Sequence, residues 1–226
     1  MCGRFTLRTE HKLLVEQFAS AIAPDDQLRI RYNVAPTQGV ATLRVTESDR
    51  QLSLLHWGLI PSWAKDAKIG YRMINARAET VAEKPSFRSA FKKRRCLVLS
   101  DGYYEWKKST DCKDRKQPYY IRMEDELPFA FAGLWERWER GEQPLESCTI
   151  ITTDANEITR NIHDRMPVIL RPENYDTWLD PEFEDQDELQ SMLVPYENDN
   201  LVTVPVSTTV NSPRNDVPEC IKPVAM

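Results

Sequence analysis

The sequence predicts an α+β fold, a single domain whose core is a curved, mainly antiparallel β-sheet with several short helices around it. Many short runs of β-branched and aromatic residues, each suited to one strand, follow one another with only scattered helical patterns between them. The 15 prolines cut the chain of 226 residues into short elements, and no Gly- or Ser-rich linker divides it. We therefore expect residues 2–222 to form one domain, with Met1 removed.

The first elements are a helix, a loop and a hairpin. The helix is expected to begin near Thr9 as its N-cap, with apolar residues on one face. These residues are Leu13, Leu14, Phe18 and Ile22. RYNVAPT is expected to be an irregular loop, because Pro36 disfavours a helical residue before it. VATLRV and QLSLLHW, joined by the polar residues 46–50, predict a β-hairpin.

Further strands are predicted from apolar runs bounded by turn residues. They cover residues 73–78, 96–99, 103–107, 119–123, 129–134, 148–152 and 201–206. Short helices are expected at residues 86–93, after Asp154, at 173–179 and at 185–193. The helix after Asp154 is predicted because Asp154 and Glu157 stand at capping-box spacing, with an acid in place of the usual Ser or Thr.

Charge and composition narrow the classes of function. A net charge of -5 argues against a broad electrostatic grip on duplex DNA, although the basic run FRSAFKKRR leaves a local basic groove open. No apolar run approaches the roughly 20 residues of a membrane helix. Arg4 and Arg8 stand where a signal peptide would need its apolar centre. The five cysteines are scattered, without C-x-x-C pairs or histidines at ligand spacing, so we expect no metal, no cofactor and a reducing, cytoplasmic compartment.

Position 2 is the most informative in the chain. If Met1 is trimmed, Cys2 carries both a free α-amine and a thiol. Such a 1,2-aminothiol condenses with an aldehyde, since the amine forms an imine and the thiol adds across it to close a thiazolidine. With ordinary pKa values of about 7.7–8.0 and about 8.5, both groups are partly reactive at neutral pH. For Cys2 alone, chance placement after Met1 is the better interpretation, so other residues must decide. If the segment is extended, Arg4 would share its face.

Two strand motifs add candidates. MINARAET carries Asn75 and Arg77 two residues apart, hence on one face of a strand, where Asn75 could orient a reacting group and Arg77 hold a phosphate. An edge strand with solvated polar residues explains that motif equally well. In DGYYEWK, Glu105 stands between Tyr104 and Trp106. Beside aromatic rings the pKa of a carboxyl group rises, which suits general acid–base work, although the exposed face of an alternating strand is the simpler explanation.

Two further candidates lie in polar or Pro-bearing segments. His163 in NIHDRMP, one of three histidines, is flanked by Asp164 and Arg165 at the end of the helix expected after Asp154. Histidine is the usual proton shuttle near neutral pH, though a hydrogen-bonded structural histidine competes. Trp63 in GLIPSWAKD could stack on a nucleobase, as in single-strand binders, for about 1–3 kcal/mol per base. A lone Trp is more often part of a core.

Together these motifs resemble one protein family. MCGRF, RYNVAPT, GLIPSW, INARAET, DGYYEW and IHDRMPVIL occur in the order shown by the SOS response-associated peptidase (SRAP) family. The match runs from Cys2 to about Pro205, with NSPRND beyond it also familiar. Several motifs in a fixed order are far more specific than any one of them. The resemblance implies an SRAP-type domain that crosslinks covalently to abasic sites in DNA and shields the lesion during the response to DNA damage.

The resemblance also implies residue roles. Cys2 would form a thiazolidine with the aldehyde of the ring-opened abasic sugar, and Asn75 would position both. Glu105 would assist the proton transfers, and His163 would stabilise or protonate the sugar hydroxyl. The implied DNA contacts are Arg4, Arg77, Trp63, Trp106, Thr152 and Arg165.

The implied partner is single-stranded DNA, or a junction of single and double strands, with an abasic site. A buried Cys2 could not reach into a stacked duplex, so single strands should be preferred. Arginines placed as point clamps on two or three phosphates release few counterions, which reconciles DNA binding with an acidic protein. The expected location is cytoplasmic, and on the nucleoid when bound to DNA. Protein partners stay open.

Two other interpretations belong to different classes. The family's description implies a thiol peptidase, which we interpret as self-processing of the Met1–Cys2 bond, with ordinary aminopeptidase trimming an equally good route. An AP-lyase-like activity is implied alongside it. The third interpretation is a non-covalent binder of modified DNA, which would need no free α-amine on Cys2.

Overall fold

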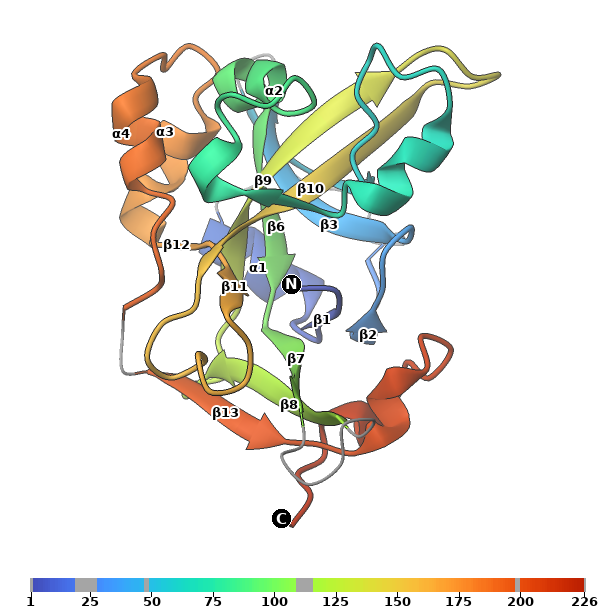
Figure 1. Ribbon diagram of the computed structural model, residues 1–226, viewed down its shortest axis with the longest axis vertical. Coiled ribbons are helices and arrows are strands. Elements are labelled where there is room, and N and C mark those ends of the chain that lie inside the picture. The colour runs from blue at the N-terminus through green and yellow to red at the C-terminus, as the bar shows by residue number, and fades with distance from the viewer. Residues whose placement is uncertain (1, 19–27, 47–48, 109–115, 198–199, 226) are drawn as a thin grey trace.

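Two largely antiparallel β-sheets form the framework of the protein, as its computed structural model shows (Figure 1). The structure describes residues 2–18, 28–46, 49–108, 116–197 and 200–225. Its strands are β1 (Phe5–Leu7), β2 (Arg31–Val34), β3 (Gly39–Thr46), β4 (Asp49–Trp57), β5 (Asn75–Arg77), β6 (Arg95–Ser100), β7 (Gly102–Lys108), β8 (Lys116–Met123), β9 (Phe129–Trp138), β10 (Leu145–Asp154), β11 (Arg165–Pro167), β12 (Ile169–Leu170) and β13 (Leu201–Pro205). The predicted α+β class is confirmed.

The larger sheet has eight strands and is strongly curved. Its order is β11-β10-β4-β3-β6-β9-β12, with β5 paired to β10. Because β10 pairs with β9 on one side and with β4 on the other, the strands β10, β4, β3, β6 and β9 close into a ring. The predicted hairpin is β3 with β4, paired from Gly39↔His56 to Thr46↔Asp49. β6 (RCLVLS) is buried at every position, as expected for a strand covered on both faces.

The smaller sheet has five strands in the order β13-β8-β7-β1-β2. It carries the N-terminal strand, which pairs Phe5 with Tyr103 on β7 and with Val34 on β2. Gly102 at the start of β7 has to be a glycine, because a Cβ there would come within 2.4 Å of the Tyr120 ring.

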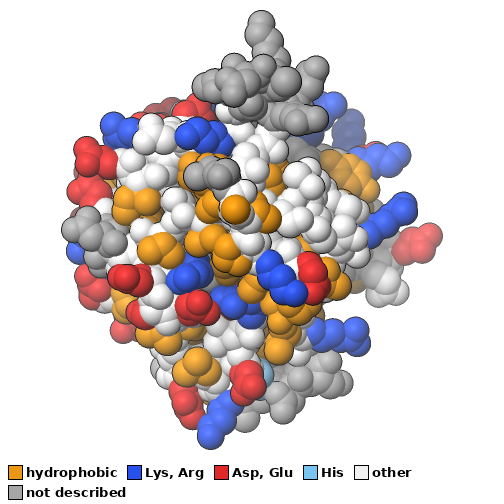
Figure 2. All heavy atoms as spheres, turned by 90° about the horizontal axis from the view of Figure 1, so that it is seen from below, with side chains coloured by type: hydrophobic (Ala, Val, Ile, Leu, Met, Phe, Trp, Pro, Cys, Tyr) orange, Lys and Arg blue, Asp and Glu red, His pale blue; other side chains and the backbone are white. Residues whose placement is uncertain are grey.

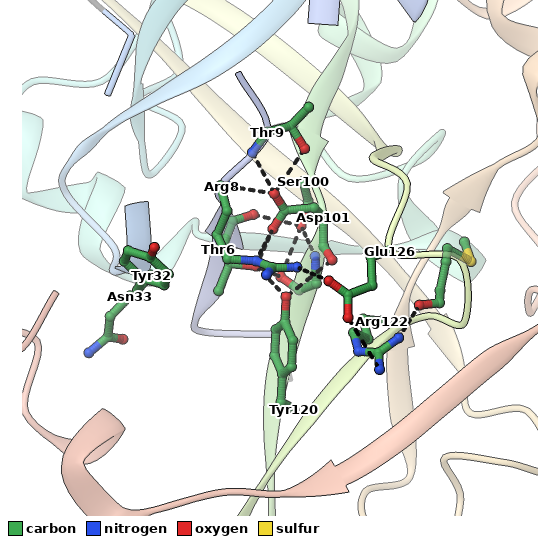
Figure 3. A network of polar contacts seen from close by, with 12 residues as sticks. Thr6, Arg8, Thr9, Tyr32, Asn33, Ser100, Asp101, Tyr120, Arg122 and Glu126 are labelled. Carbon is green, nitrogen blue, oxygen red and sulfur yellow. Dashed lines mark hydrogen bonds and ion pairs between the residues drawn. The ribbon is translucent and has the colours of Figure 1, made fainter. Parts of the chain in front are cut away.

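A single residue, Asp101, separates β6 in the larger sheet from β7 in the smaller one, and it is 1% exposed. Figure 3 shows donors converging on its carboxylate. Thr6 Oγ1 donates at 2.5 Å, the Thr9 N–H at 2.9 Å and Thr9 Oγ1 at 3.0 Å, and the Arg8 N–H donates as well. The Arg8 guanidinium lies 3.5 Å from Asp101 and 3.6 Å from Glu126. A buried carboxylate is stable only when paired and hydrogen-bonded in this way, and here it fixes the N-terminal segment at the junction of the sheets.

The α-helices are α1 (His11–Phe18), α2 (Arg88–Lys93), α3 (Tyr175–Leu179) and α4 (Gln186–Ser191), and the 3₁₀ helices are η1 (Ala67–Arg72), η2 (Ala78–Thr80), η3 (Pro172–Asn174), η4 (Thr208–Asn211) and η5 (Pro218–Ile221). α4 lies within the helix predicted at residues 185–193, and Asp185 is its N-cap, with the carboxylate accepting from two backbone N–H groups. α1 begins two residues after the predicted N-cap, because Thr9 bonds Asp101 instead. Met1, Ile22 and the turn between β3 and β4 lie outside the described residues.

A buried arginine joins α2 and α3 to the sheet. Arg95 is 3% exposed, and burial lowers its pKa to about 10. Its guanidinium donates to main-chain carbonyl oxygens in the last turns of both helices and in the segment just after α3. These belong to Phe91, Lys92, Trp178, Asp180 and Phe183. The last carbonyl groups of a helix have no partner within the helix and need donors from elsewhere. The Arg95 side chain supplies such donors to both α2 and α3.

Two predicted elements are wrong. No helix follows Asp154: β10 runs through this residue, its carboxylate binds Arg165 at 2.7 Å, and residues 157–162 form turns. Asn156 serves as the cap instead, with Oδ1 accepting from the N–H and Oγ1 of Thr159 at 2.9 Å. RYNV is not a loop but strand β2. The buried amide of Asn33 is satisfied by backbone carbonyls of Val210, Ser212 and Asn215, which the local sequence cannot reveal.

The four described cysteines, Cys2, Cys96, Cys148 and Cys220, are free and buried. Across the described ranges, no three His, Cys, Asp or Glu side chains gather so as to hold a metal ion. Within the same ranges, none of the helices has the length and apolar character needed to cross a membrane.

Candidate functional site

Cys2 lies just before β1 and is fully buried, in an apolar cluster that also contains Trp57, Tyr103 and Ile150. Its backbone carbonyl accepts a hydrogen bond from Asn75 Nδ2 at 2.8 Å. Asn75 stands on β5, which belongs to the larger sheet, whereas Cys2 leads into the smaller one. This hydrogen bond therefore connects the two sheets at the predicted nucleophile.

Glu105 is the second ionisable group at this point. It faces inward from β7 and is 3% exposed. Burial raises its pKa to about 7, the direction that its aromatic neighbours predict. Burial also raises the pKa of the Cys2 thiol, and the charge of Glu105 raises it further, while the backbone N–H of Arg4 donates to the sulfur and opposes both. A carboxyl group with this pKa exchanges protons near neutral pH, beside a thiol that needs a base.

His163 lies on the turn that precedes β11 and is partly buried. Its Nδ1 accepts from the Arg165 N–H at 3.0 Å, so the neutral ring carries its proton on Nε2. Desolvation lowers the pKa of His163, while Asp164, whose carboxylate lies 2.9 Å from Nδ1, raises it. Asp164 is 87% exposed, so water screens its charge and the neutral ring prevails near pH 7. The charge of Asp164 also acts on Glu105, which places this turn close to the buried carboxyl group.

Arg77 on β5 and Arg165 on β11 stand on two strands that each pair with β10, and the two arginines differ in their surroundings. Arg77 is exposed on β5, opposite Thr152 on β10. Arg165 is held by Glu79 at 2.6 Å, by Asp154 at 2.7 Å and by the carbonyl of Thr152 at 2.7 Å. Thr152 is 1% exposed, and its Oγ1 donates to a backbone carbonyl. Arg77 is thus the more accessible of these two cations, whereas Arg165 is tied to neighbouring carboxylates and Thr152 is buried.

Arg4 and Trp106 both contact the C-terminal segment. The Arg4 guanidinium donates to Asn33 Oδ1 at 2.9 Å, to the Val210 carbonyl at 2.7 Å and to the Asn211 carbonyl at 3.3 Å. Trp106 Nε1 donates to Asn211 Oδ1 at 2.8 Å. The side chain of Arg4 therefore points toward η4 while its backbone N–H serves Cys2, and the predicted sharing of one face by the two side chains is wrong.

Trp63 is exposed, at 51%, in the loop before η1. It lines an open groove of about 610 Å³ together with Tyr71, which is 65% exposed. Three exposed cations, Lys65, Lys68 and Arg72, border the same groove, with one exposed carboxylate, Asp66, among them. The groove therefore offers two aromatic faces and a local excess of positive charge, which is the composition that binds unpaired nucleotides.

The groove differs from the face of the molecule shown in Figure 2, where acidic and basic side chains are interspersed around apolar ones. Such a face offers no continuous basic surface to a nucleic acid. Individual exposed cations that each contact one phosphate are more compatible with a net charge of -5 than a broad basic patch would be.

The structure brings Cys2, Asn75 and Glu105 together, with the His163 turn nearby, and it places Trp63 in a separate groove. Sequence reasoning missed the cations that follow Trp63, although their spacing in AKDAKIGYR is visible. It also missed Tyr103, which shares a face of β7 with Glu105 by simple alternation. The sequence around Asp101 does not indicate its structural role, because its hydrogen-bond partners come from β1 and the residues just after β1, far away in the chain.

Comparisons with known proteins found a matching family model, named relatives and a solved structure of the same fold. The family model described as SOS response associated peptidase (SRAP) matches residues 1–213. The abasic site processing protein YoqW of Bacillus subtilis is 50% identical, and the alignment covers 98% of this chain and 99% of that protein. The abasic site processing protein HMCES of Xenopus tropicalis is 38% identical, covering 79% of this chain and 59% of that protein. A crystal structure from Bacteroides thetaiotaomicron superimposes with a TM-score of 0.88 at 29% identity, covering 99% of this chain and 100% of that one.

Proposed function

Because the chain belongs to the SOS response-associated peptidase family, we propose that it processes abasic sites in DNA and bonds to them covalently through Cys2. The names of its relatives support the first part, since those from Bacillus subtilis and Xenopus tropicalis are called abasic site processing proteins. The covalent step is inferred from the chemistry of the site.

One observation carries the proposal. A cysteine at position 2 lies buried beside a carboxyl group whose pKa burial raises to about 7, and an amide holds the cysteine's own carbonyl at 2.8 Å. A cysteine with a purely structural role needs neither the carboxyl group nor the amide. An aminothiol that must gain and lose protons during a reaction benefits from both.

The proposed reaction begins once Met1 has been removed. The α-amine of Cys2 attacks the aldehyde of the ring-opened sugar, and loss of water gives an imine. The Cys2 thiol then adds to the imine carbon and closes a thiazolidine, so that one water is released overall. Glu105 moves protons in these steps, and Asn75 keeps the Cys2 backbone in place. The neutral His163 ring donates from Nε2–H to the sugar hydroxyl.

The DNA contacts follow from exposure. Arg77 binds a phosphate beside the lesion, because its guanidinium is accessible on β5. Trp63 stacks on an unpaired base in the groove along η1. Arg165 and Thr152 contribute from β11 and β10. Arg4 and Trp106 contribute through the segment that includes Asn211, which both of them hydrogen-bond.

Single-stranded DNA and strand junctions are the proposed substrates. Cys2 is 0% exposed, so the sugar has to enter the protein rather than the protein enter a duplex. Moving a nucleotide out of a stacked duplex costs a few kcal/mol, whereas an unpaired nucleotide moves freely.

The test is the intact mass of the purified protein before and after mixing with single-stranded DNA that contains one abasic site. The expected result is loss of Met1 and a gain equal to the whole oligonucleotide, with much less product on an intact duplex. The Cys2→Ala variant, and a protein whose Cys2 amine is blocked by an N-terminal tag, should give no adduct.

The rival interpretations predict different masses. A thiol peptidase acting on its own N-terminus would retain some activity as Cys2→Ser, whereas an aldehyde-trapping aminothiol loses its stable ring. A processed wild-type protein that binds abasic DNA without a heat-stable adduct would overturn the covalent step and favour non-covalent binding.

A further inference from the structure

Tyr103 stands two residues before Glu105 on β7, so the two side chains leave the strand on the same face. Tyr103 is 0% exposed and belongs to the same buried cluster as Cys2. Its ring packs edge-on against Phe131, with the ring centroids 6.0 Å apart. The side chain is therefore fixed among apolar neighbours, with its hydroxyl group inside the protein.

Tyr103 and Cys2 pack in one buried cluster, so the tyrosine side chain lies in the same part of the interior as the nucleophile. Burial raises the pKa of Tyr103 well above its usual value, and the nearby groups Cys2 and Glu105 raise it further. Tyr103 thus stays a neutral O–H donor throughout the physiological range. A neutral donor close to a thiol can stabilise the thiolate by a charge-assisted hydrogen bond.

The hydroxyl of Tyr103 has no hydrogen-bond partner among the described residues. Leaving a buried hydroxyl unpaired lowers stability, and a phenylalanine would fill the same space without that cost. Asn75 Oδ1 is in the same situation, although Nδ2 of this amide binds the Cys2 carbonyl at 2.8 Å. A donor and an acceptor without partners in the described chain thus accompany Cys2 in the interior. Buried polar atoms of this kind call for an explanation in the reaction.

We propose that Tyr103 is a further functional residue of this site, whose hydroxyl donates a hydrogen bond to the Cys2 sulfur while that sulfur is a thiolate. This rests on the covalent reaction proposed above. In the closing step, the Glu105 carboxylate takes the proton of the Cys2 thiol. The sulfur electron pair forms the C–S bond, the imine π electrons move to nitrogen, and that nitrogen takes the proton back from Glu105. Protons and electrons balance without an added oxidant or reductant.

The role of Tyr103 follows from the other donor to the sulfur. The backbone N–H of Arg4 donates to the Cys2 sulfur, which is fully buried when it becomes charged. A second donor makes the thiolate more accessible near neutral pH. By the strength usual for hydrogen bonds to charged groups, its loss should slow ring closure by about 10- to 100-fold.

The experiment compares Tyr103→Phe with Tyr104→Phe. Each variant loses one hydroxyl from β7, but the Tyr104 hydroxyl donates to the Tyr32 carbonyl at 2.6 Å in a different cluster. Three quantities are measured: the single-turnover rate of adduct formation at saturating single-stranded abasic DNA across pH, the affinity for DNA carrying a tetrahydrofuran analogue without an aldehyde, and the melting temperature.

For Tyr103→Phe we expect a rate that is about 10- to 100-fold lower, a pH profile displaced to higher pH, unchanged affinity for the analogue, and an equal or higher melting temperature. Tyr104→Phe should react within about twofold of the wild type. An unchanged rate and pH profile in Tyr103→Phe would overturn the role of Tyr103. So would equal rate losses in both variants that follow their melting temperatures.

Failure of the underlying function is seen separately, because wild-type protein that forms no adduct overturns the covalent reaction itself. If Tyr103→Phe does not fold, 3-fluorotyrosine at position 103 provides a stronger donor of nearly the same shape. It should displace the pH profile to lower pH, and an unmoved profile would refute the proposal.

Discussion

Glu105 should destabilise the protein at the pH where it is needed. The folded protein holds the Glu105 proton up to about pH 7, because burial raises this pKa from its ordinary value of 4.5. The unfolded chain loses the same proton near pH 4.5. Between these values the folded state binds more protons than the unfolded state, so the free energy of unfolding falls as the pH rises, and it levels off above pH 7.

The size of the effect follows from the two pKa values. One pKa unit equals about 1.36 kcal/mol, so ionising Glu105 inside the fold costs about 3 kcal/mol at pH 8 relative to pH 4. Glutamine at position 105 cannot ionise, and this part of the pH dependence should vanish in Glu105→Gln. For a chain of this size, about 3 kcal/mol corresponds to roughly 6–12 °C in melting temperature.

The assay is urea unfolding of the wild type and Glu105→Gln at pH 4 and pH 8, with Glu142→Gln in an exposed segment as the matched control. The change in unfolding free energy between the two pH values is compared for each protein, so that any pH-independent difference in packing between wild type and variant cancels. Between pH 4 and pH 8, the free energy of unfolding of Glu105→Gln should rise by about 3 kcal/mol relative to that of the wild type. Adduct formation by Glu105→Gln should fall sharply. The reasoning is refuted if the wild type and Glu105→Gln show the same pH dependence.

Three further outcomes are expected. Arg77→Ala should lower the slope of log Kd against log salt for single-stranded DNA by about 0.7, as for one lost phosphate contact, and an unchanged slope measured by fluorescence anisotropy would contradict this. Trp63→Ala should weaken that binding by about 1–3 kcal/mol without changing the melting temperature, since the side chain is 51% exposed. Arg95→Ala leaves helix-end carbonyls unpaired and should cost about 3–5 kcal/mol in urea unfolding, whereas a loss below about 1 kcal/mol would show that water replaces the guanidinium.

Much of the fold could be predicted because its strands are locally recognisable. β6 is a continuous apolar run, and β3 and β4 are two such runs separated by polar residues. For these elements the residue pattern and the burial agree, and the predictions are confirmed. β9 (Phe129–Trp138) continues past the predicted residues 129–134, and β10 (Leu145–Asp154) extends past the predicted residues 148–152 at both ends. Long strands continue beyond their apolar centres into charged residues such as Glu136.

The errors occurred where distant residues decide the local structure. Pro36 predicts a loop for RYNVAPT, but residues 31–34 pair as strand β2, and three carbonyls of the C-terminal segment satisfy the buried Asn33 amide. Asp154 has the spacing of a helix cap, but Arg165 on the neighbouring strand takes its carboxylate. Local propensity cannot register either partner, because each belongs to another part of the chain.

In the candidate site too, features that depend on residues adjacent in the chain can be predicted, whereas those that depend on distant residues cannot. The sequence predicts Glu105 as a carboxyl group with a raised pKa, since its aromatic neighbours are adjacent in the chain. It does not predict that the Arg4 side chain turns toward η4, because that depends on the Val210 carbonyl. Nor does alternation alone make Tyr103 a candidate, as most tyrosines on buried strands find a partner for their hydroxyl.

The junction of the two sheets explains how such distant parts remain aligned. Asn75 is fixed to the larger sheet through the pairing of β5 with β10, whereas Cys2 and Glu105 belong to segments of the smaller one. A shift between the sheets would break the contact of Asn75 with the Cys2 carbonyl before it disturbed either sheet. Asp101 opposes that shift, because its buried carboxylate holds the chain just after β1 at the one residue that links β6 to β7. The most completely hydrogen-bonded carboxylate described in the chain thus stands where a small displacement would separate the nucleophile from the amide that positions it.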